Sequence, residues 1–157
     1  MERAIQMSVP TKTIKERMAS FREASRVRGI KATHQRIEIY REVVSSDAHP
    51  DVNTIYRRVR KRIPTIALDT VYRNLKFLAD HGLVTIMGLS HEHLRVDANL
   101  EPHHHFVCVK CGIIRDFNSA ALNKVSIPQE AKHFGRPTAV RVEVKGICSQ
   151  CQEGTEE

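Results

Sequence analysis

The 157-residue sequence contains no tryptophan, and aromatic residues make up only 5% of it. It has no apolar run near the roughly 18 residues that a membrane-spanning helix requires. The first twenty residues, MERAIQMSVPTKTIKERMAS, include no apolar segment typical of a secretory signal. The hydrophobic fraction of 41% and the charged fraction of 27% exclude a fibrous or largely disordered chain. These absences predict a cytoplasmic globular protein without a membrane association.

The charge is positive and unevenly distributed. The net charge is +7, which favours a polyanionic partner. Residues 1–90 contain 17 Lys/Arg and 9 Asp/Glu, whereas residues 91–157 contain 8 and 9. The second segment also contains all four cysteines and six of the nine histidines. We therefore expect two domains with different roles, spanning residues 1–97 and 98–157.

The first domain combines helical segments with a hairpin. Apolar residues recur with helical spacing from 14 to 29, 33 to 44, 52 to 63 and 68 to 82. Thr33 is suited to cap the second of these helices, and Gly29 and Gly82 to end the first and fourth. Segments 83–87 and 93–97 then have the pattern of two strands around the turn at residues 88–90. Four helices followed by a hairpin predict a winged helix-turn-helix.

The fourth helix would be the recognition helix of that fold. Its outward side chains are predicted to be Thr70, Tyr72, Arg73 and Asn74, which can contact bases in a major groove. Taken alone, the helix could equally be a solvated surface, but the positive charge and the following hairpin favour double-stranded DNA as the partner. We expect Tyr72 and Arg73 to read bases, and Lys31 and Arg36 to contact the DNA backbone or minor groove.

The second domain has an α/β pattern. Residues 103–109 and 113–117 resemble strands, and a short helix is expected to start at Asn118 or Ser119. Val140, Val142 and Val144 alternate with charged residues, which predicts a half-buried strand. We expect the sheet containing this strand to form a homodimer, because two symmetric DNA-binding heads require a twofold axis. The overall fold class is therefore predicted to be α+β.

The cysteines form two C-x2-C pairs, Cys108/Cys111 and Cys148/Cys151, with 36 residues between them. Each pair can present two thiolates from one turn, and four thiolates make a closed tetrahedral site that suits structural Zn2+. A redox dithiol, an iron–sulfur cluster and unrelated cysteines are the alternatives. A closed site leaves no open coordination position, so we do not expect catalysis there.

A second cluster of potential ligands surrounds the sequence His103-His104-His105. On a strand, His103 and His105 share one face and could form half of a metal site. Asp97, Asp116 and His49 are further candidates. The residues alone do not join them, because the two aspartates could be surface acids and His49-Pro50 a turn.

The order of these motifs resembles the ferric uptake regulator family of bacterial metal-responsive repressors, over roughly residues 13–152. The resemblance rests on these segments: Gly29-Ile-Lys-Ala-Thr33-His-Gln35-Arg36, Ala48-His49-Pro50, Asp69-Thr-Val-Tyr72-Arg73-Asn-Leu, Gly82-Leu-Val, Arg95-Val-Asp97, His103-His-His105-Phe-Val-Cys108-Val-Lys-Cys111-Gly and Gly146-Ile-Cys148-Ser-Gln-Cys151. Within the family, the chain is most similar to the peroxide-sensing branch. Asp116 favours that branch, since the iron-sensing branch commonly has Glu at this position.

The resemblance implies a regulatory site for Fe2+ or Mn2+. Its ligands would be three histidines and two aspartates: His49, Asp97, His103, His105 and Asp116. Such a metal would fix the angle between the two domains, so that a homodimer fits the half-sites of a palindromic operator. In the peroxide-sensing branch, iron reacts with hydrogen peroxide and a ligating imidazole is oxidised, here His49 or His103. Manganese would close the dimer but resist this reaction.

Three other functions remain open from the sequence. The closest is an iron-, manganese- or zinc-sensing repressor of the same family without a peroxide response. A metal-dependent hydrolase could use the histidine and aspartate cluster, and a redox chaperone could use the C-x2-C pairs reversibly. The basic helical domain and the closed four-cysteine site argue against the hydrolase, so we do not expect an enzyme. A zinc assay after peroxide treatment would distinguish the redox chaperone.

Overall fold

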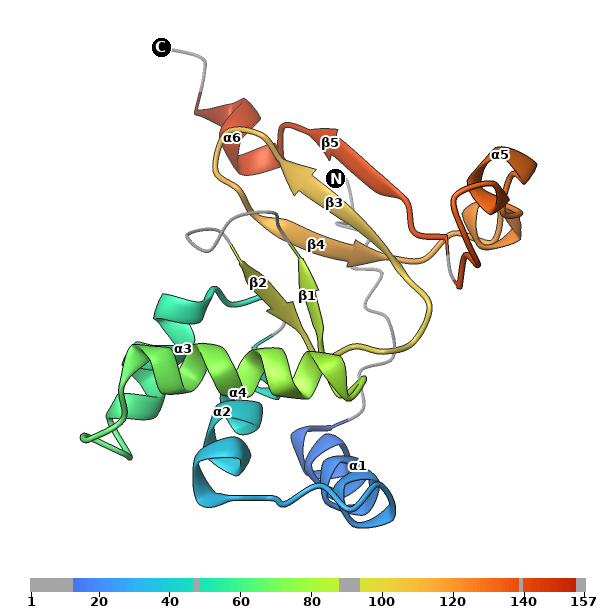
Figure 1. Ribbon diagram of the computed structural model, residues 1–157. Coiled ribbons are helices and arrows are strands. Elements are labelled where there is room, and N and C mark those ends of the chain that lie inside the picture. Colours follow the sequence, from blue (N-terminus) through green and yellow to red (C-terminus); the bar gives the residue numbers. More distant parts are fainter. Residues whose placement is uncertain (1–12, 47–48, 88–93, 139, 155–157) are drawn as a thin grey trace. The chain divides into compact units, whose positions relative to one another are not determined.

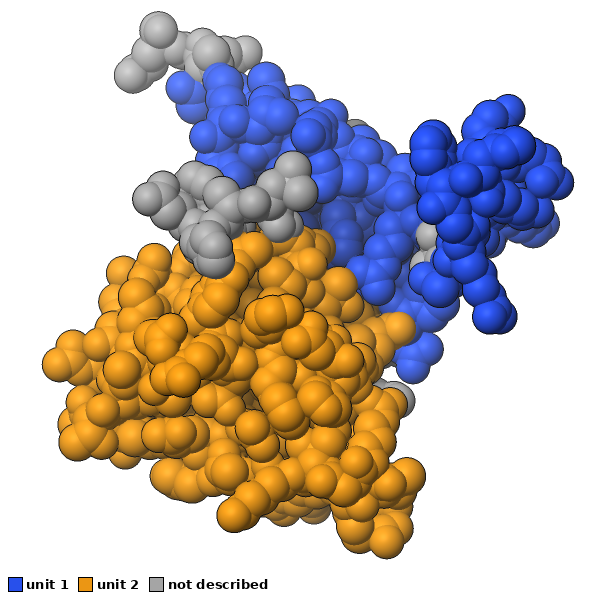
Figure 2. Space-filling model, viewed as in Figure 1, with its two compact units in different colours: residues 1–10, 101–157 blue, residues 11–100 orange. Residues whose placement is uncertain are grey.

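The computed structural model describes residues 13–46, 49–87, 94–138 and 140–154 (Figure 1). The chain divides into two compact units, with the boundary between Leu100 and Glu101 (Figure 2). We refer to residues 11–100 as the front unit and to residues 101–157 as the back unit. The boundary lies three residues after the one predicted from the sequence; that the two units are separate functional domains stays a prediction.

The front unit contains four helices whose starts follow from local capping. They are α1 (Ile14–Val27), α2 (His34–Val44), α3 (Val52–Arg60) and α4 (Leu68–Asp80). Thr13 and Glu16 form a capping box at the start of α1. The Thr33 hydroxyl accepts the N–H of Arg36, and the Asp51 carboxylate accepts the N–H of Thr54. The predicted cap of α2 is therefore confirmed.

The two predicted glycine stops are also confirmed. Gly29 and Gly82 adopt left-handed conformations with φ of 64° and 65°. Behind each glycine, the next N–H reaches back to the last turn of the helix, as in a Schellman motif: Ile30 to the Ser25 carbonyl and Leu83 to the Leu78 carbonyl. The third helix ends at Arg60, earlier than the predicted residue 63, because the chain turns before Pro64.

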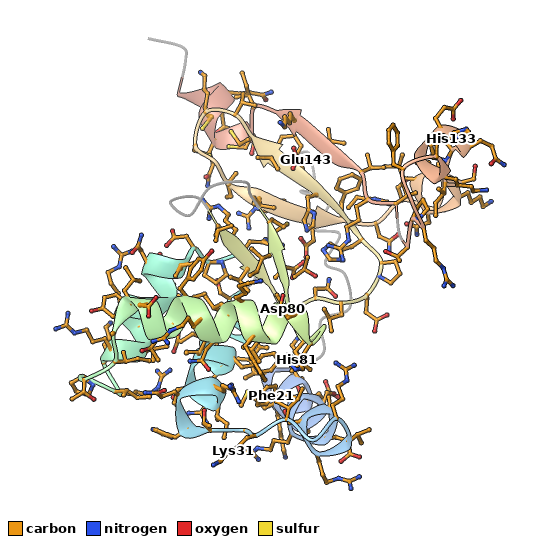
Figure 3. The ribbon with its side chains drawn as sticks, viewed as in Figure 1. Phe21, Lys31, Asp80, His81, His133 and Glu143 are labelled. Carbon is orange, nitrogen blue, oxygen red and sulfur yellow. The ribbon has the colours of Figure 1, made fainter. Side chains whose placement is uncertain are left out.

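The apolar faces of all four helices meet in one core, which includes Phe21 (Figure 3). Phe21 from α1 stacks on Tyr40 from α2, with ring centroids 4.4 Å apart. Strands β1 (Thr85–Met87) and β2 (Arg95–Asp97) follow α4 and pair antiparallel, with Thr85 opposite Asp97. The predicted turn at residues 88–90 lies outside the described residues. Helices followed by this hairpin form the predicted winged helix.

The back unit is built on a three-stranded sheet. Its elements are β3 (His104–Cys108), β4 (Ile114–Phe117), the 3-10 turn η2 (Leu122–Lys124), α5 (Gln129–Lys132), β5 (Glu143–Gly146) and α6 (Ser149–Glu153). Strand β3 lies between β4 and β5, antiparallel to the first and parallel to the second (Figure 1). The combination of the two units confirms the α+β prediction. Among the described residues, every helix is too short or too polar to cross a bilayer.

The last strand differs from the prediction. It begins at Glu143 rather than at Val140. Of the three predicted valines, Val140 and Val144 are 37% and 41% exposed, and only Val142 is half-buried. The alternating pattern was correct for an extended segment, because the Val142 carbonyl accepts the N–H of His105. The pattern did not predict the exposure of Val140 and Val144, because no described residue of the single chain covers these side chains.

Candidate metal centres and nucleic-acid interface

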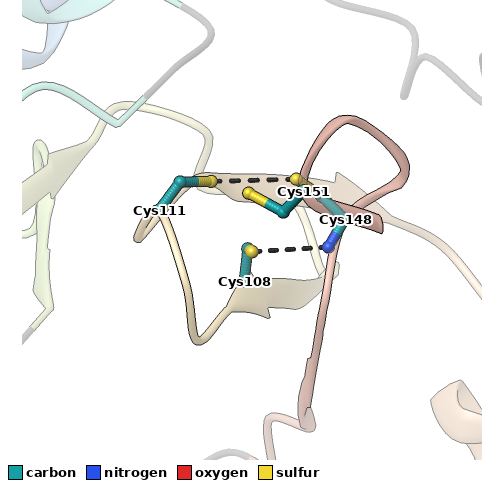
Figure 4. Close-up of side chains that lie close together, drawn as sticks. All are labelled: Cys108, Cys111, Cys148 and Cys151. Atoms are coloured by element: carbon teal, nitrogen blue, oxygen red, sulfur yellow. Dashed lines mark hydrogen bonds between the residues drawn. The ribbon is translucent and has the colours of Figure 1, made fainter. Parts of the chain in front are cut away.

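The four cysteines converge from two turns of the back unit. Cys108 ends β3, Cys111 follows in the tight turn before β4, and Cys148 and Cys151 flank the first turn of α6 (Figure 4). Their sulfur atoms lie within 4.8 Å of one another, and the four thiols form no disulfide. The Cys111 and Cys148 sulfurs are 3.7 Å apart. Two thiolates bound tetrahedrally at about 2.3 Å lie about 3.8 Å apart, so the cluster suits a structural zinc ion.

Backbone donors favour the thiolate form of Cys108. Backbone N–H groups of Cys111 and Cys148 lower the pKa of the Cys108 thiol to about 6, and the Cys148 N–H lies 3.3 Å from the Cys108 sulfur. Hydrogen bonds with Cys148 and Cys111 raise the pKa of Cys151 to about 12. Of these two thiols, the buried Cys108 is therefore the one that more readily supplies the deprotonated sulfur that Zn2+ requires.

A second group of ligand atoms lies on the back sheet. His103 and His105 bring their Nε2 atoms to 2.9 Å from each other. Asp116 pairs directly with His105 across β3 and β4, and its Oδ1 lies 3.5 Å from the His105 Nε2 and 3.8 Å from the His103 Nε2. Both imidazoles are buried. The structure thus brings these three predicted residues together within one unit.

The chemistry of this group fits a metal ion. His103 places its Nδ1 2.6 Å from the Glu101 carbonyl, so Nδ1 carries the proton and Nε2, the nitrogen that faces His105, is the unprotonated one. Two nitrogen ligands at about 2.1 Å on adjacent positions of a metal lie about 3 Å apart, close to the separation of the two Nε2 atoms. Imidazole and carboxylate ligands suit Fe2+, Mn2+ or Zn2+.

His104 has a different role from its neighbours. Its Nε2 lies 2.9 Å from the Asn123 Oδ1, and its Nδ1 accepts the backbone N–H of Val142. Both ring nitrogens are therefore used in holding η2 and the approach to β5 against β3. The predicted alternation of the three histidines agrees with this difference, since His104 takes no part in the ligand group.

The other two predicted ligands form a pair in the front unit. His49 and Asp97 are buried, and the His49 Nε2 lies 3.7 Å from the Asp97 Oδ2. His49 has a positive φ of 49°, which non-glycine residues rarely adopt. The loop is held in this conformation by β2, because Arg95 donates to the His49 carbonyl and the Val96 N–H donates to the Pro50 carbonyl. That all five residues bind one metal stays a prediction.

The predicted recognition helix, α4, exposes some of its predicted contacts. Arg73 is largely exposed and forms an ion pair of 2.8 Å with Asp69 one turn earlier. Thr70 and Tyr72 are half-buried. Asn74 is engaged within the unit: its amide donates to the Thr70 carbonyl, and its Oδ1 accepts a hydrogen bond from Arg36. Contacts of these residues with DNA stay predictions.

The two residues predicted to contact the DNA backbone differ in their surroundings. Lys31 is exposed in the loop before α2 (Figure 3). Arg36 is half-buried, and its guanidinium donates to Asn74 and to the Lys31 carbonyl while lying over the Phe77 ring. Arg36 is therefore occupied within the front unit.

Several supporting residues had no signal in the sequence. The Glu101 carbonyl that orients His103 is a backbone atom, so side-chain patterns say nothing about it. Asn123 supports His104 from 19 residues away. Arg95 lies two residues before Asp97, which places it near the site in the sequence. Its hydrogen bond to the His49 carbonyl, however, depends on how the loop folds.

Comparison with known proteins supports this architecture. The model of the ferric uptake regulator family matches residues 27–145. A peroxide-responsive repressor, PerR, of Staphylococcus epidermidis is 35% identical over 141 residues, covering 89% of this chain and 91% of the relative. The family match includes the Cys108/Cys111 turn, His103, His105 and helix α4.

Two solved structures have similar folds. The Campylobacter jejuni peroxide stress regulator has a TM-score of 0.64 and 30% identity, covering 82% of this chain and 97% of that one. A zinc-bound manganese uptake regulator has a TM-score of 0.61 and 30% identity, covering 87% and 99%.

Proposed function

The chain belongs to the ferric uptake regulator family of metal-responsive repressors, and we propose that it represses transcription in a metal-dependent manner and senses hydrogen peroxide. The observation that carries this proposal is the convergence of the His103 and His105 imidazoles with Asp116, apart from the four-cysteine cluster. A repressor with two kinds of site can keep one metal for structure and use the other for sensing.

We propose that the regulatory metal is Fe2+ or Mn2+. The back unit would contribute His103, His105 and Asp116, and the front unit would contribute His49 and Asp97. Three imidazoles and two carboxylates provide a nitrogen and oxygen environment that differs from the sulfur environment of the zinc cluster. Zn2+ would bind such ligands more tightly in general, so metal supply in the cell also decides which ion is bound.

The two sets of ligands explain how metal binding would control DNA binding. A metal held by residues of both units favours the arrangement in which all five reach it, and so shifts the population towards that arrangement. In a homodimer, the same restriction would set the separation of the two α4 helices. Half-sites of a palindromic operator have a fixed helical spacing, so one arrangement binds well.

Peroxide sensing would act on the same ligands. Iron bound there would supply the electron that activates hydrogen peroxide within reach of the imidazoles. In the net reaction, the peroxide would transfer one oxygen atom to an imidazole carbon and its second oxygen would leave as water. His103 is held by the Glu101 carbonyl and cannot easily turn away, and His49 is held by its loop. An imidazole that gains an oxygen is a poorer metal ligand. Oxidation of His103 would remove a ligand of the back unit, and oxidation of His49 would remove a ligand of the front unit. The proposal assigns no catalytic turnover to the chain.

Operator binding tests the proposal. A binding site is first selected from a random-sequence DNA pool with the Mn2+-loaded protein, and its affinity is then measured by fluorescence anisotropy at fixed salt. Both the Fe2+ and the Mn2+ forms should bind it more tightly than the metal-free form. Brief peroxide treatment should abolish binding by the Fe2+ form and spare the Mn2+ form.

Two outcomes separate the proposal from its competitors. Binding that depends on Fe2+ but survives peroxide would favour an iron-sensing repressor of the same family. Release of DNA that follows zinc loss and cysteine oxidation, with both histidines intact, would also contradict histidine-based sensing. An Arg73→Ala variant provides the DNA control: it should hold both metals and lose discrimination between the selected site and random DNA.

A further inference from the structure

Arg36 has contacts that suggest a role other than binding DNA directly. We propose that Arg36 is a positioning residue, whose guanidinium fixes the recognition helix α4 relative to the start of α2 and the loop before it. This inference rests on the proposed DNA-binding function. It replaces the expectation from the sequence that Arg36 contacts the DNA backbone.

Three interactions hold the guanidinium in place. Its Nε donates to the Asn74 Oδ1 at 3.1 Å, and its Nη1 donates to the Lys31 carbonyl at 2.7 Å. Its central carbon lies 3.7 Å from the centroid of the Phe77 ring. The planar group therefore contacts Asn74 and Phe77 of α4, which are 38 and 41 residues away in the sequence, and Lys31 of the loop, which is 5 residues away.

Asn74 carries this restraint into the part of α4 that would read bases. Its side-chain nitrogen donates to the Thr70 carbonyl at 2.8 Å, while its oxygen accepts the bond from Arg36. Arg73 is the adjacent residue and points outward. A small rotation of α4 would break the bond between Arg36 and Asn74 and would also displace Thr70 and Arg73 from a groove.

The same guanidinium holds the backbone at Lys31. This residue is exposed, so its ammonium group can reach a phosphate while its carbonyl is anchored by Arg36 (Figure 3). One side chain thus sets the separation between a backbone contact and the base-reading helix. Lysine could not replace it, because a single ammonium group has neither the planar face for Phe77 nor two donors at fixed directions.

A charge-preserving substitution distinguishes positioning from phosphate contact. If Arg36 touched a phosphate, Arg36→Lys would keep most of the affinity, and Arg36→Ala would weaken binding to all DNA and reduce the salt slope by about one. If Arg36 positions α4, Arg36→Lys and Arg36→Ala should both weaken binding to the selected site. Binding to random DNA and the salt slope should stay nearly unchanged.

The experiment uses the full-length Mn2+- and Zn2+-loaded protein and the operator selected from the random pool. Affinities for the selected site and for random DNA are measured at several salt concentrations. We expect Arg36→Lys to lose about tenfold in affinity for the selected site, as for one lost hydrogen bond to a charged group. Arg41→Lys is the matched control on the same helix: Arg41 pairs with Glu38, and its variant should bind like the wild type.

A double-mutant cycle tests the link to Asn74. Because the two side chains share one hydrogen bond, the double variant Arg36→Lys/Asn74→Ala should lose less affinity than the sum of the losses of the two single variants. Additive losses would overturn the inference, as would wild-type binding by Arg36→Lys. If circular dichroism shows that Arg36→Lys is unfolded, Phe77→Leu carries the test: it should lower the ratio of specific to random binding, and an unchanged ratio would overturn the inference.

The controls also separate this inference from the proposed function. If the wild-type protein selects no DNA site with any metal, the proposed function fails before the variants are compared. If the wild type binds its selected site and Arg36→Lys binds equally well, the proposed function stands and the positioning role is wrong.

Discussion

The back unit should depend on zinc for its folding, because it buries little apolar surface of its own. The core cluster of buried apolar residues lies entirely in the front unit. Among the described residues of the back unit, the buried apolar side chains are Cys108 and Ile114, and the first of these belongs to the four-cysteine cluster. Several large apolar side chains of this unit are instead exposed: Val109, Val125, Phe134, Val140, Val144 and Ile147.

The magnitudes favour zinc as the main stabilising interaction. Burial of one isoleucine contributes about 1.5–3 kcal/mol, whereas ordering a single residue costs about 1–2 kcal/mol in backbone entropy. A structural zinc site contributes about 10–16 kcal/mol in small zinc-binding peptides at neutral pH. Loss of the ion therefore removes more free energy than the buried apolar side chains of the back unit provide.

The perturbation is Cys148→Ser. It removes the thiolate at the start of α6, one of the four in the cluster. We expect zinc stoichiometry to fall well below one per chain, and β3, β4 and β5 to lose hydrogen-exchange protection. Helices α1 to α4 should keep their protection, because their core holds no cysteine. Gln150→Ser is the matched control, since Gln150 lies in the same turn but is not a ligand.

Peptide-resolved hydrogen exchange with mass spectrometry, together with a zinc assay, measures both quantities. Full protection of β3 in a zinc-free Cys148→Ser protein would refute the reasoning, as would retention of stoichiometric zinc. Equal loss of protection in both units would also be inconsistent with a front core that is stable by itself.

Three further predictions concern single positions. Asp116→Glu lengthens one ligand by a methylene, so operator binding with Mn2+ should persist while peroxide inactivation of the Fe2+ form slows, as followed by anisotropy. Asp51→Ala removes the cap on the Thr54 N–H and should lower the unfolding free energy by about 1 kcal/mol in urea at pH 7. Burial raises the pKa of Asp51, but hydrogen bonds from Thr54 and nearby arginine charges more than offset this and hold the pKa below its ordinary value. The ionised Asp51 therefore stabilises the folded state above about pH 3.9, and this stabilisation is lost as the pH falls through the lowered folded pKa. In Gly146→Ala, the new Cβ would lie 2.9 Å from the Phe106 ring, so thermal unfolding should show a loss of about 1–3 kcal/mol.

Much of the front unit could be predicted because its signals are local. Helix periodicity, the Thr33 cap and the stops at Gly29 and Gly82 depend on neighbouring residues, and each was found where expected. The two C-x2-C pairs were equally informative, since each turn places its own thiols. The end of α3 was misplaced because helical spacing continues into the turn before Pro64.

The rest depends on contacts between distant residues. The sequence showed that Val144 lies in an extended segment, but not that β5 would pair parallel to β3 with an exposed face. Likewise, arginine is a residue type that commonly binds phosphate, and nothing in the local sequence indicates that Asn74 and Phe77 will hold the guanidinium of Arg36. Packing between elements decides such partners, and a single sequence carries little information about it.

The most direct test of the central claim is the mass of the histidine-containing peptides after peroxide treatment. The Zn2+-loaded protein is supplied with Fe2+ or Mn2+, exposed briefly to hydrogen peroxide, digested and analysed by mass spectrometry, with zinc measured in parallel. The account predicts one added oxygen on a peptide containing His49 or His103 in the Fe2+ sample, none in the Mn2+ sample, and zinc retained in both. Unmodified histidines in an Fe2+ sample that has released its DNA would contradict it.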